Sequence, residues 1–252
     1  MLRRAVVIIA LGCSTLLFGT LAIVCCLIIP NGNPLLWMAR PWARCILWAA
    51  GARVRADRLE RLPPGRPVIF VANHQSYFDI LALIRALPGQ YRVIAKKELF
   101  SIPVFGWALS VAGFIKIDRS DRDKAVSSLQ SAAAKIRKGL SIVVFAEGTR
   151  SADGSLLPFK KGGFLLAIEN GCPIVPVSLS GSRAVMPKDS FDVRPGLIDV
   201  VIGEPIDPAA YTFETRDQLI AATRRAIEAG FTPLKSLDAP AAKEPERMLQ
   251  ER

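Results

Sequence analysis

The chain has 252 residues, of which 51% are apolar, and it carries a formal net charge of +11. This length is enough for one sizeable domain with an anchor and is marginal for two full domains. The positive charge indicates an anionic partner, either nucleic acid, a membrane surface or a phosphorylated substrate, or else only a solvated basic surface. With one histidine and five cysteines lacking a C-x-x-C spacing, the sequence predicts no metal site.

A run without any charged residue covers residues 5–29. As a helix it would be about 37 Å long, enough to cross a hydrocarbon core of about 30 Å with some tilt. Arg3 and Arg4 precede it as in a signal peptide, but the run exceeds a signal-peptide core and no A-x-A cleavage site follows. The sequence therefore predicts an uncleaved membrane anchor. Such an anchor, without any nucleic-acid-binding motif, favours a membrane over nucleic acid.

A second apolar stretch, residues 35–50, combines tryptophans and arginines in the way that suits a membrane interface. The predicted anchor, residues 1–52, is therefore either a single span or a hairpin of two membrane-embedded helices. In both arrangements the basic residues that follow the first run place the remaining chain on the cytoplasmic side of an inner membrane. These residues are Arg40, Arg44, Arg53, Arg55 and Arg58.

From residue 53 onwards, short apolar runs alternate with longer segments of helical periodicity. This alternation predicts an α/β domain with a mostly parallel central sheet flanked by helices. The predicted strands are residues 67–72, 91–95, 113–117, 141–146, 173–179 and 198–202, and the predicted helices are residues 76–87, 102–111, 121–138, 162–170 and 215–229. The domain would occupy residues 53–231, and residues 232–252, rich in Ala, Pro and charge, would be a disordered tail.

Basic and titratable residues follow five of the predicted strands. Because sites in such sheets form beyond the carboxyl ends of the strands, we expect several of these residues to converge on one cleft. Their chemistry suits a site that binds an anion and moves a proton. The strand ends carry Asn73-His74, Lys96-Lys97, Asp118-Arg119, Glu147-Gly148-Thr149-Arg150 and Ser180-Gly181-Ser182-Arg183.

His74, the one histidine, lies five residues before Asp79. On one regular helix these two side chains would point to different faces, so the pair requires His74 on a loop and Asp79 in the first helical turn. Ser76 and Asp79 have the spacing of a capping box, which supports that helix start. Asp79 would then hold one ring nitrogen and leave the other basic. The alternative is an ordinary histidine beside a capping aspartate.

The turn Glu147-Gly148-Thr149-Arg150 has two interpretations. Either a Glu–Arg ion pair closes the loop, or Arg150 binds a phosphate through its forked guanidinium. A G-x-S-x-G nucleophile motif is absent from the sequence. Direct attack by a substrate hydroxyl, with His74 as the base, therefore needs fewer groups than a covalent intermediate.

Four ordered blocks resemble those of the glycerolipid acyltransferase family, with bacterial 1-acylglycerol-3-phosphate acyltransferases as the nearest likeness. Each block alone is weak, but four in the correct order and spacing are a specific signal. The blocks are Asn73-His74-Gln75-Ser76-Tyr77-Phe78-Asp79, Gly113-Phe114-Ile115-Lys116-Ile117-Asp118-Arg119, Glu147-Gly148-Thr149-Arg150 and Ile174-Val175-Pro176-Val177.

The resemblance implies that His74 deprotonates an acceptor hydroxyl and that Asp79 orients it. Glu147 would contact the glycerol or orient Arg150, and Gly148 would permit the tight turn. The substrate-binding positions would be Arg119, Glu147, Gly148, Thr149 and Arg150, with Lys96 or Lys97 adding to a phosphate site.

The implied reaction moves a fatty acyl group from acyl-CoA or acyl carrier protein to the sn-2 hydroxyl of 1-acylglycerol 3-phosphate, giving phosphatidic acid. It requires no cofactor, and it would take place at an anionic membrane surface. The same chemistry on glycerol 3-phosphate, another lysophospholipid or a lyso-aminolipid stays open. Alternatives from other classes are a non-catalytic membrane-tethered lipid-binding protein and a thioester hydrolase.

Overall fold

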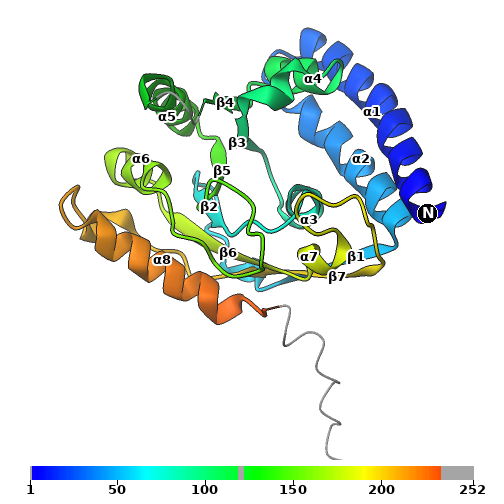
Figure 1. Cartoon of the computed structure of the whole chain (residues 1–252). Helices are drawn as coiled ribbons and strands as arrows, with labels where there is room; N and C mark the ends of the chain where they lie inside the picture. The colour runs from blue at the N-terminus through cyan, green and yellow to red at the C-terminus, as the bar shows by residue number, and fades with distance from the viewer. Residues whose placement is uncertain (1, 119–121, 234–252) are drawn as a thin grey trace, which may run out of the picture.

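The computed structural model describes residues 2–118 and 122–233. Within them, one seven-stranded sheet carries helices on both faces (Figure 1). The strands are β1 (Ala52–Asp57), β2 (Ile69–Ala72), β3 (Tyr91–Lys96), β4 (Ile115–Ile117), β5 (Ser141–Phe145), β6 (Ile174–Ser180) and β7 (Gly196–Ile202). The α-helices are α1 (Leu2–Ile28), α2 (Pro34–Ala50), α3 (Phe78–Ala86), α4 (Phe105–Val111), α5 (Arg122–Arg137), α6 (Gly162–Asn170), α7 (Ser182–Val185) and α8 (Arg216–Gly230). Short 3-10 helices are η1 (Leu59–Arg61), η2 (Lys97–Ser101) and η3 (Pro208–Ala210).

The strand order in the sheet is β1-β7-β6-β2-β5-β3-β4. The five strands from β6 to β4 are mutually parallel, so their carboxyl ends meet at one edge. β7 pairs antiparallel with β6, and β1 pairs parallel with β7. The prediction of a mostly parallel α/β sheet is therefore confirmed, and β2, the strand that precedes His74, lies in its middle.

Alternate residues of β2 enter two different cores, as expected of a strand buried on both faces. Phe70 and Ala72 pack with α2 and α3, whereas Ile69 and Val71 pack with α5, α6 and α8. Figure 1 shows the same layers, with the sheet between these two groups of helices. Because His74 lies two positions after Ala72, the β2 alternation directs His74 towards the α2–α3 face.

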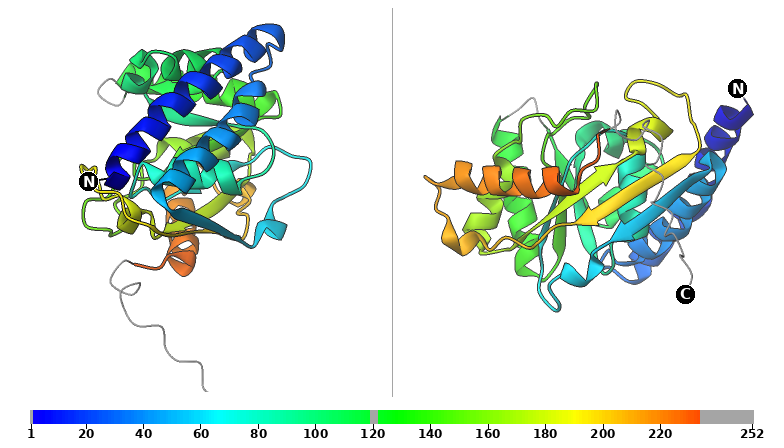
Figure 2. Two further views of the ribbon diagram at one scale, coloured as in Figure 1. Left: turned by 90° about the vertical axis from the view of Figure 1, so that its right-hand side faces the viewer. Right: turned by 90° about the horizontal axis from the view of Figure 1, so that it is seen from below.

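The two N-terminal helices lie side by side against the domain (Figure 2). Trp42 on α2 donates to the Thr15 hydroxyl on α1 at 3.0 Å, and Arg4 at the start of α1 lies over the Phe191 ring. Fully buried Arg92 ties the turn between the helices to β3, because it donates to the Asn31 carbonyl at 2.8 Å. The hairpin and the sheet thus share one packed body. Within the described residues, α1 alone is long and apolar enough to cross a membrane.

The structure adds a strand that periodicity missed. β1 has the sequence Ala-Arg-Val-Arg-Ala-Asp, and most of its residues are exposed, so it lacks the apolar run by which the buried strands were predicted. Arg119 and residues 234–252 lie outside the described residues, so the role given to Arg119 and the disordered tail stay predictions.

Candidate active site

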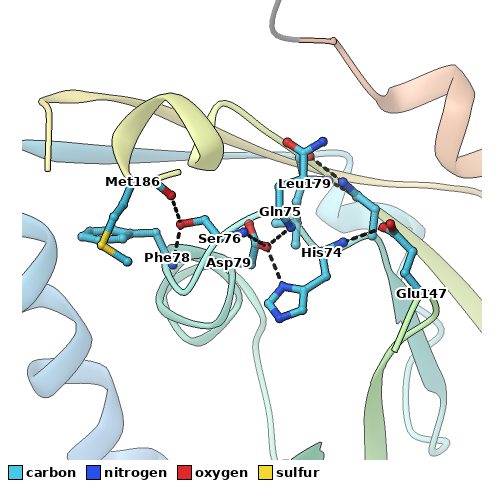
Figure 3. A network of polar contacts seen from close by, with 9 residues as sticks. His74, Gln75, Ser76, Phe78, Asp79, Glu147, Leu179 and Met186 are labelled. Carbon is cyan, nitrogen blue, oxygen red and sulfur yellow. Dashed lines mark hydrogen bonds and ion pairs between the residues drawn. The ribbon is translucent and has the colours of Figure 1, made fainter. Parts of the chain in front are cut away.

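His74 lies on the loop between β2 and α3, as its spacing from Asp79 required (Figure 3). Its Nδ1 is 2.7 Å from Asp79 Oδ2, and its ring stacks on Phe145 of β5 with centroids 3.9 Å apart. The His74 side chain is 17% exposed. With a carboxylate at Nδ1, the proton belongs on that nitrogen, and Nε2 is left as the basic atom. The predicted His–Asp contact is confirmed.

Asp79 is fully buried in the first turn of α3. Its Oδ2 accepts the N–H groups of Gln75 at 2.6 Å and Ser76 at 2.8 Å in addition to facing the His74 ring. The Ser76 hydroxyl accepts the Phe78 N–H at 3.2 Å and donates to the Met186 carbonyl. Asp79 thus contacts both the His74 ring and the backbone at the start of its helix, and the catalytic role of the pair stays a prediction.

Neighbouring strands fix the backbone of the His74 loop. The Asn73 amide exchanges two hydrogen bonds with the Leu179 backbone of β6, at 2.7 and 2.9 Å. On the other side, the Ser151 N–H donates to the His74 carbonyl at 2.8 Å. The sequence placed Asn73 in the motif without a role. Its partner lies on a strand distant in sequence, and only the fold brings the two together.

Glu147 does not pair with Arg150. Its buried carboxylate accepts the His74 N–H at Oε1 (2.8 Å) and the Leu157 N–H at Oε2 (2.9 Å), and the glycerol contact implied for it stays a prediction. The correction follows from topology, because β5 lies next to β2 and delivers Glu147 under the loop. Burial raises the pKa of Glu147 to about 7, although both backbone hydrogen bonds oppose the shift.

Arg150 is held loosely beside the loop. Its guanidinium lies 3.9 Å from the centroid of the Tyr77 ring, and Nη2 is 3.4 Å from the exposed carboxylate of Asp189. Nη1 is buried and has no hydrogen-bond partner among the residues that the structure describes. The Glu147–Arg150 ion pair expected in one interpretation is replaced by the Asp189 contact. A guanidinium with a buried unused donor and one weak partner is suited to receive an anion.

The other predicted binding residues lie at different places on the same edge. Gly148 has φ +68°, so the tight turn before Arg150 requires a glycine, and Thr149 is exposed on that turn. Lys96 ends β3 and Lys97 begins η2, and β3 lies two strands from β2, or about 10 Å across the sheet. Both lysines face carboxylates, since Lys96 lies 3.4 Å from Glu98 and Lys97 lies 2.7 Å from Asp118.

An apolar cavity of about 80 Å³ lies where α1, α2, α3 and α4 meet. Helix α3, which carries Asp79, contributes Ile80 and Ile84 to its wall, and α1 contributes Phe18 and Gly19. No local sequence signal marks this cavity, because its walls come from four separate helices.

The fold and the site define a class: an α/β protein whose sheet presents a half-buried histidine on a buried aspartate, with a neighbouring arginine, at its carboxyl edge. A family model described as acyltransferase matches residues 53–180. The chain belongs to this acyltransferase family, as the four sequence blocks indicated.

The chain is also similar to named proteins of this family. A chloroplastic 1-acyl-sn-glycerol-3-phosphate acyltransferase of Brassica napus is 36% identical over 77% of this chain, and the chain spans 60% of that protein's length. The 1-acyl-sn-glycerol-3-phosphate acyltransferase of Saccharomyces cerevisiae is 35% identical over 92% of this chain and 79% of its own. The crystal structure of the 1-acyl-sn-glycerophosphate acyltransferase of Thermotoga maritima matches with a TM-score of 0.81 and 26% identity, over 96% of this chain and 97% of that one.

Proposed function

We propose that this protein transfers a fatty acyl group from acyl-CoA or acyl carrier protein to the sn-2 hydroxyl of 1-acylglycerol 3-phosphate, forming phosphatidic acid. The observation that carries the proposal is the contact of half-buried His74 with buried Asp79, which leaves Nε2 basic next to the loosely held Arg150. The assigned activities of the Brassica napus, yeast and Thermotoga maritima relatives support this acceptor.

The reaction proceeds in one displacement on the thioester. His74 Nε2 takes the proton of the acceptor hydroxyl while the hydroxyl oxygen bonds to the carbonyl carbon of the thioester. The carbon–sulfur bond then breaks, and the leaving thiolate receives the proton from His74. Asp79 stabilises the imidazolium that exists between the two proton transfers. A base and a bound acceptor are sufficient, because the thioester is already activated and binding supplies proximity.

Arg150 binds the phosphate of the acceptor. The phosphate would displace the single 3.4 Å contact with Asp189, which is 73% exposed and therefore contributes little. It would also satisfy the buried Nη1 donor in the forked geometry that guanidinium groups prefer. The apolar cavity behind α3 offers room for part of a fatty acyl chain.

The exposed apolar surface of the N-terminal hairpin supports a site at a membrane surface. Many large apolar side chains of α1 are exposed, and Trp48 on α2 is 82% exposed, a surface that is unfavourable in water. Since α1 packs along α2 and reaches Phe191, it lies on the domain instead of projecting from it. We therefore propose a hairpin embedded in the cytoplasmic leaflet of an inner membrane, with the site facing the cytoplasm.

A panel of acceptors tests the function and the role of Arg150 together. With labelled acyl thioester, wild-type protein should acylate lysophosphatidate in preference to glycerol 3-phosphate, lyso-aminolipid and uncharged monoacylglycerol. Arg150→Gln should raise the KM for lysophosphatidate by about 10- to 100-fold, the effect of a lost charged hydrogen bond, and leave monoacylglycerol transfer unchanged. Arg194→Gln, an exposed arginine paired with Asp192, is the control. A lower melting temperature with an unchanged acceptor ratio would support a structural role for Arg150.

Protease protection tests the hairpin. With a cleavable tag at each end of the full chain, intact spheroplasts should protect both tags, and inverted vesicles should expose both. A single span would place the N-terminal tag outside, where protease added to spheroplasts removes it. Loss of the N-terminal tag alone would therefore contradict the hairpin.

A further inference from the structure

Arg224 on the C-terminal helix α8 binds the loop that supports the active site. Its Nη1 and Nη2 donate to the carbonyl oxygens of Leu157 and Leu156, both at 2.9 Å, and its guanidinium lies over the Phe159 ring. Its Nε donates to Glu228 one turn further along the helix at 2.8 Å. A planar fork of this kind matches two adjacent carbonyl groups, which a lysine cannot do.

The same loop is the second support of Glu147. The Leu157 N–H donates to Glu147 Oε2, while Oε1 accepts the N–H of His74. The Leu156 carbonyl and the Leu157 N–H belong to one planar peptide unit, and they point in opposite directions across it. That peptide therefore lies between a guanidinium at its negative end and a carboxylate at its positive end. Bonds in such a series polarise and strengthen one another.

We propose that Arg224 is a positioning residue for the acyl transfer, acting through the Leu156–Leu157 peptide and Glu147 on the backbone of His74. The inference rests on the proposed function. Arg224 lies beyond residues 53–180, the part that the family model matches. It reaches the loop because α8 packs on β6 beside α6, on the face of the sheet that also carries α5 (Figure 1). The sequence of α8 gives little indication of this role, because Arg224 only borders the buried stripe formed by Leu219, Thr223 and Ile227.

The charges around Glu147 give this role a signature in the pH dependence. Burial and the neighbouring Asp79 raise the pKa of Glu147 to about 7, whereas Arg224 and the amides of His74 and Leu157 lower it. Lys160 packs on Gly148, the residue after Glu147. The hydrogen bonds by which Glu147 links His74 to Leu157 require the ionised Glu147 carboxylate. Activity should therefore fall as the pH drops through about 7. Removing Arg224 raises this pKa further, and the acid limb of the profile should move to higher pH.

The experiment compares Arg224→Gln with Arg225→Gln, an exposed arginine of the same helix, in the full-length protein. With labelled acyl thioester and lysophosphatidate, Arg224→Gln should lower kcat by about 10- to 100-fold, the cost of a small misplacement of a reacting group, with KM nearly unchanged. The acid limb of its pH–activity profile should move to higher pH. Arg225→Gln should behave as wild type. Arg224→Lys, which keeps the charge without the fork, should retain the acid limb and lose part of kcat.

A double-mutant cycle with Glu147→Gln isolates the coupling. Because Arg224 is proposed to act through Glu147, Arg224→Gln should have little further effect on kcat in the Glu147→Gln background. Full additivity would overturn the proposal. So would an Arg224→Gln protein with a lower melting temperature but with wild-type kcat and acid limb per folded molecule.

Amide hydrogen exchange at residues 73–77 gives a readout that is independent of the substrate. It should be faster in Arg224→Gln than in Arg225→Gln, with α8 itself equally protected in both. Unchanged exchange at residues 73–77 would contradict the positioning role of Arg224. If wild type shows no acyl transfer but the loop exchange responds, the proposed function fails and the structural link from Arg224 to His74 stands.

Discussion

Replacing His74 with alanine is expected to lower the rate of acyl transfer by about 10³-fold, within the range that a general base contributes. The reason is that Asp79 holds Nδ1 and leaves Nε2 to act as the base, and the sequence has no other histidine to replace it. The measurement is single-turnover transfer of labelled acyl groups to lysophosphatidate.

The fold of this variant must be checked, because His74 stacks on Phe145. The loop backbone is held by Glu147 and Ser151 through main-chain groups, which alanine retains, so melting temperature and vesicle binding should change little. Wild-type transfer by a folded His74→Ala protein would refute the mechanism. A non-catalytic lipid-binding protein would be indicated if wild type and variant were equally inactive and bound vesicles equally well.

Asp79→Asn should reduce kcat by about 10²- to 10³-fold with a smaller change in KM. Asp79 Oδ2 faces three donors: His74 Nδ1 and the N–H groups of Gln75 and Ser76. An asparagine that turns its oxygen to these donors keeps the bonds but removes the charge that stabilises the imidazolium. One that turns its NH₂ group to them sets donor against donor and favours the wrong ring tautomer. Both orientations lower kcat, which rapid-quench kinetics will measure.

Ser76→Ala is the matched control for this prediction. It removes the hydroxyl that accepts the Phe78 N–H and so weakens the same helix start, by about 1 kcal/mol, without touching the His74 ring. The Ser76 variant should lose thermal stability and keep most of its kcat. If both variants lose activity only in proportion to their unfolding, Asp79 is a helix cap and has no part in catalysis.

Several features of the site could be predicted from short stretches of the sequence. The spacing of His74, Ser76 and Asp79 required a loop followed by a helix start, and the structure has both. The apolar run before His74 predicted the buried strand β2, and Gly148 marked a turn that needs positive φ. Each of these follows from interactions within a few residues of the chain, which is the range that periodicity and capping rules describe.

The role of Glu147 could not be read in this way. In sequence it stands three residues before Arg150, which left open an ion pair within the turn. In the fold it lies under a loop 73 residues earlier in the chain, and it holds the N–H of His74. The pairing of β2 with β5 decides this, and strand order is a long-range property that no single segment specifies.

The sequence by itself determined the α/β class, the apolar N-terminal helix, the family and the identity of the His74–Asp79 pair. These depend on periods of two and 3.6 residues and on short spacings, which act locally. Only the tertiary structure decided that β1 joins the sheet, that Arg150 meets Asp189, and that Arg224 reaches the loop beneath His74. Such contacts join residues far apart in the chain, and they form because burial of the apolar faces fixes which elements become neighbours.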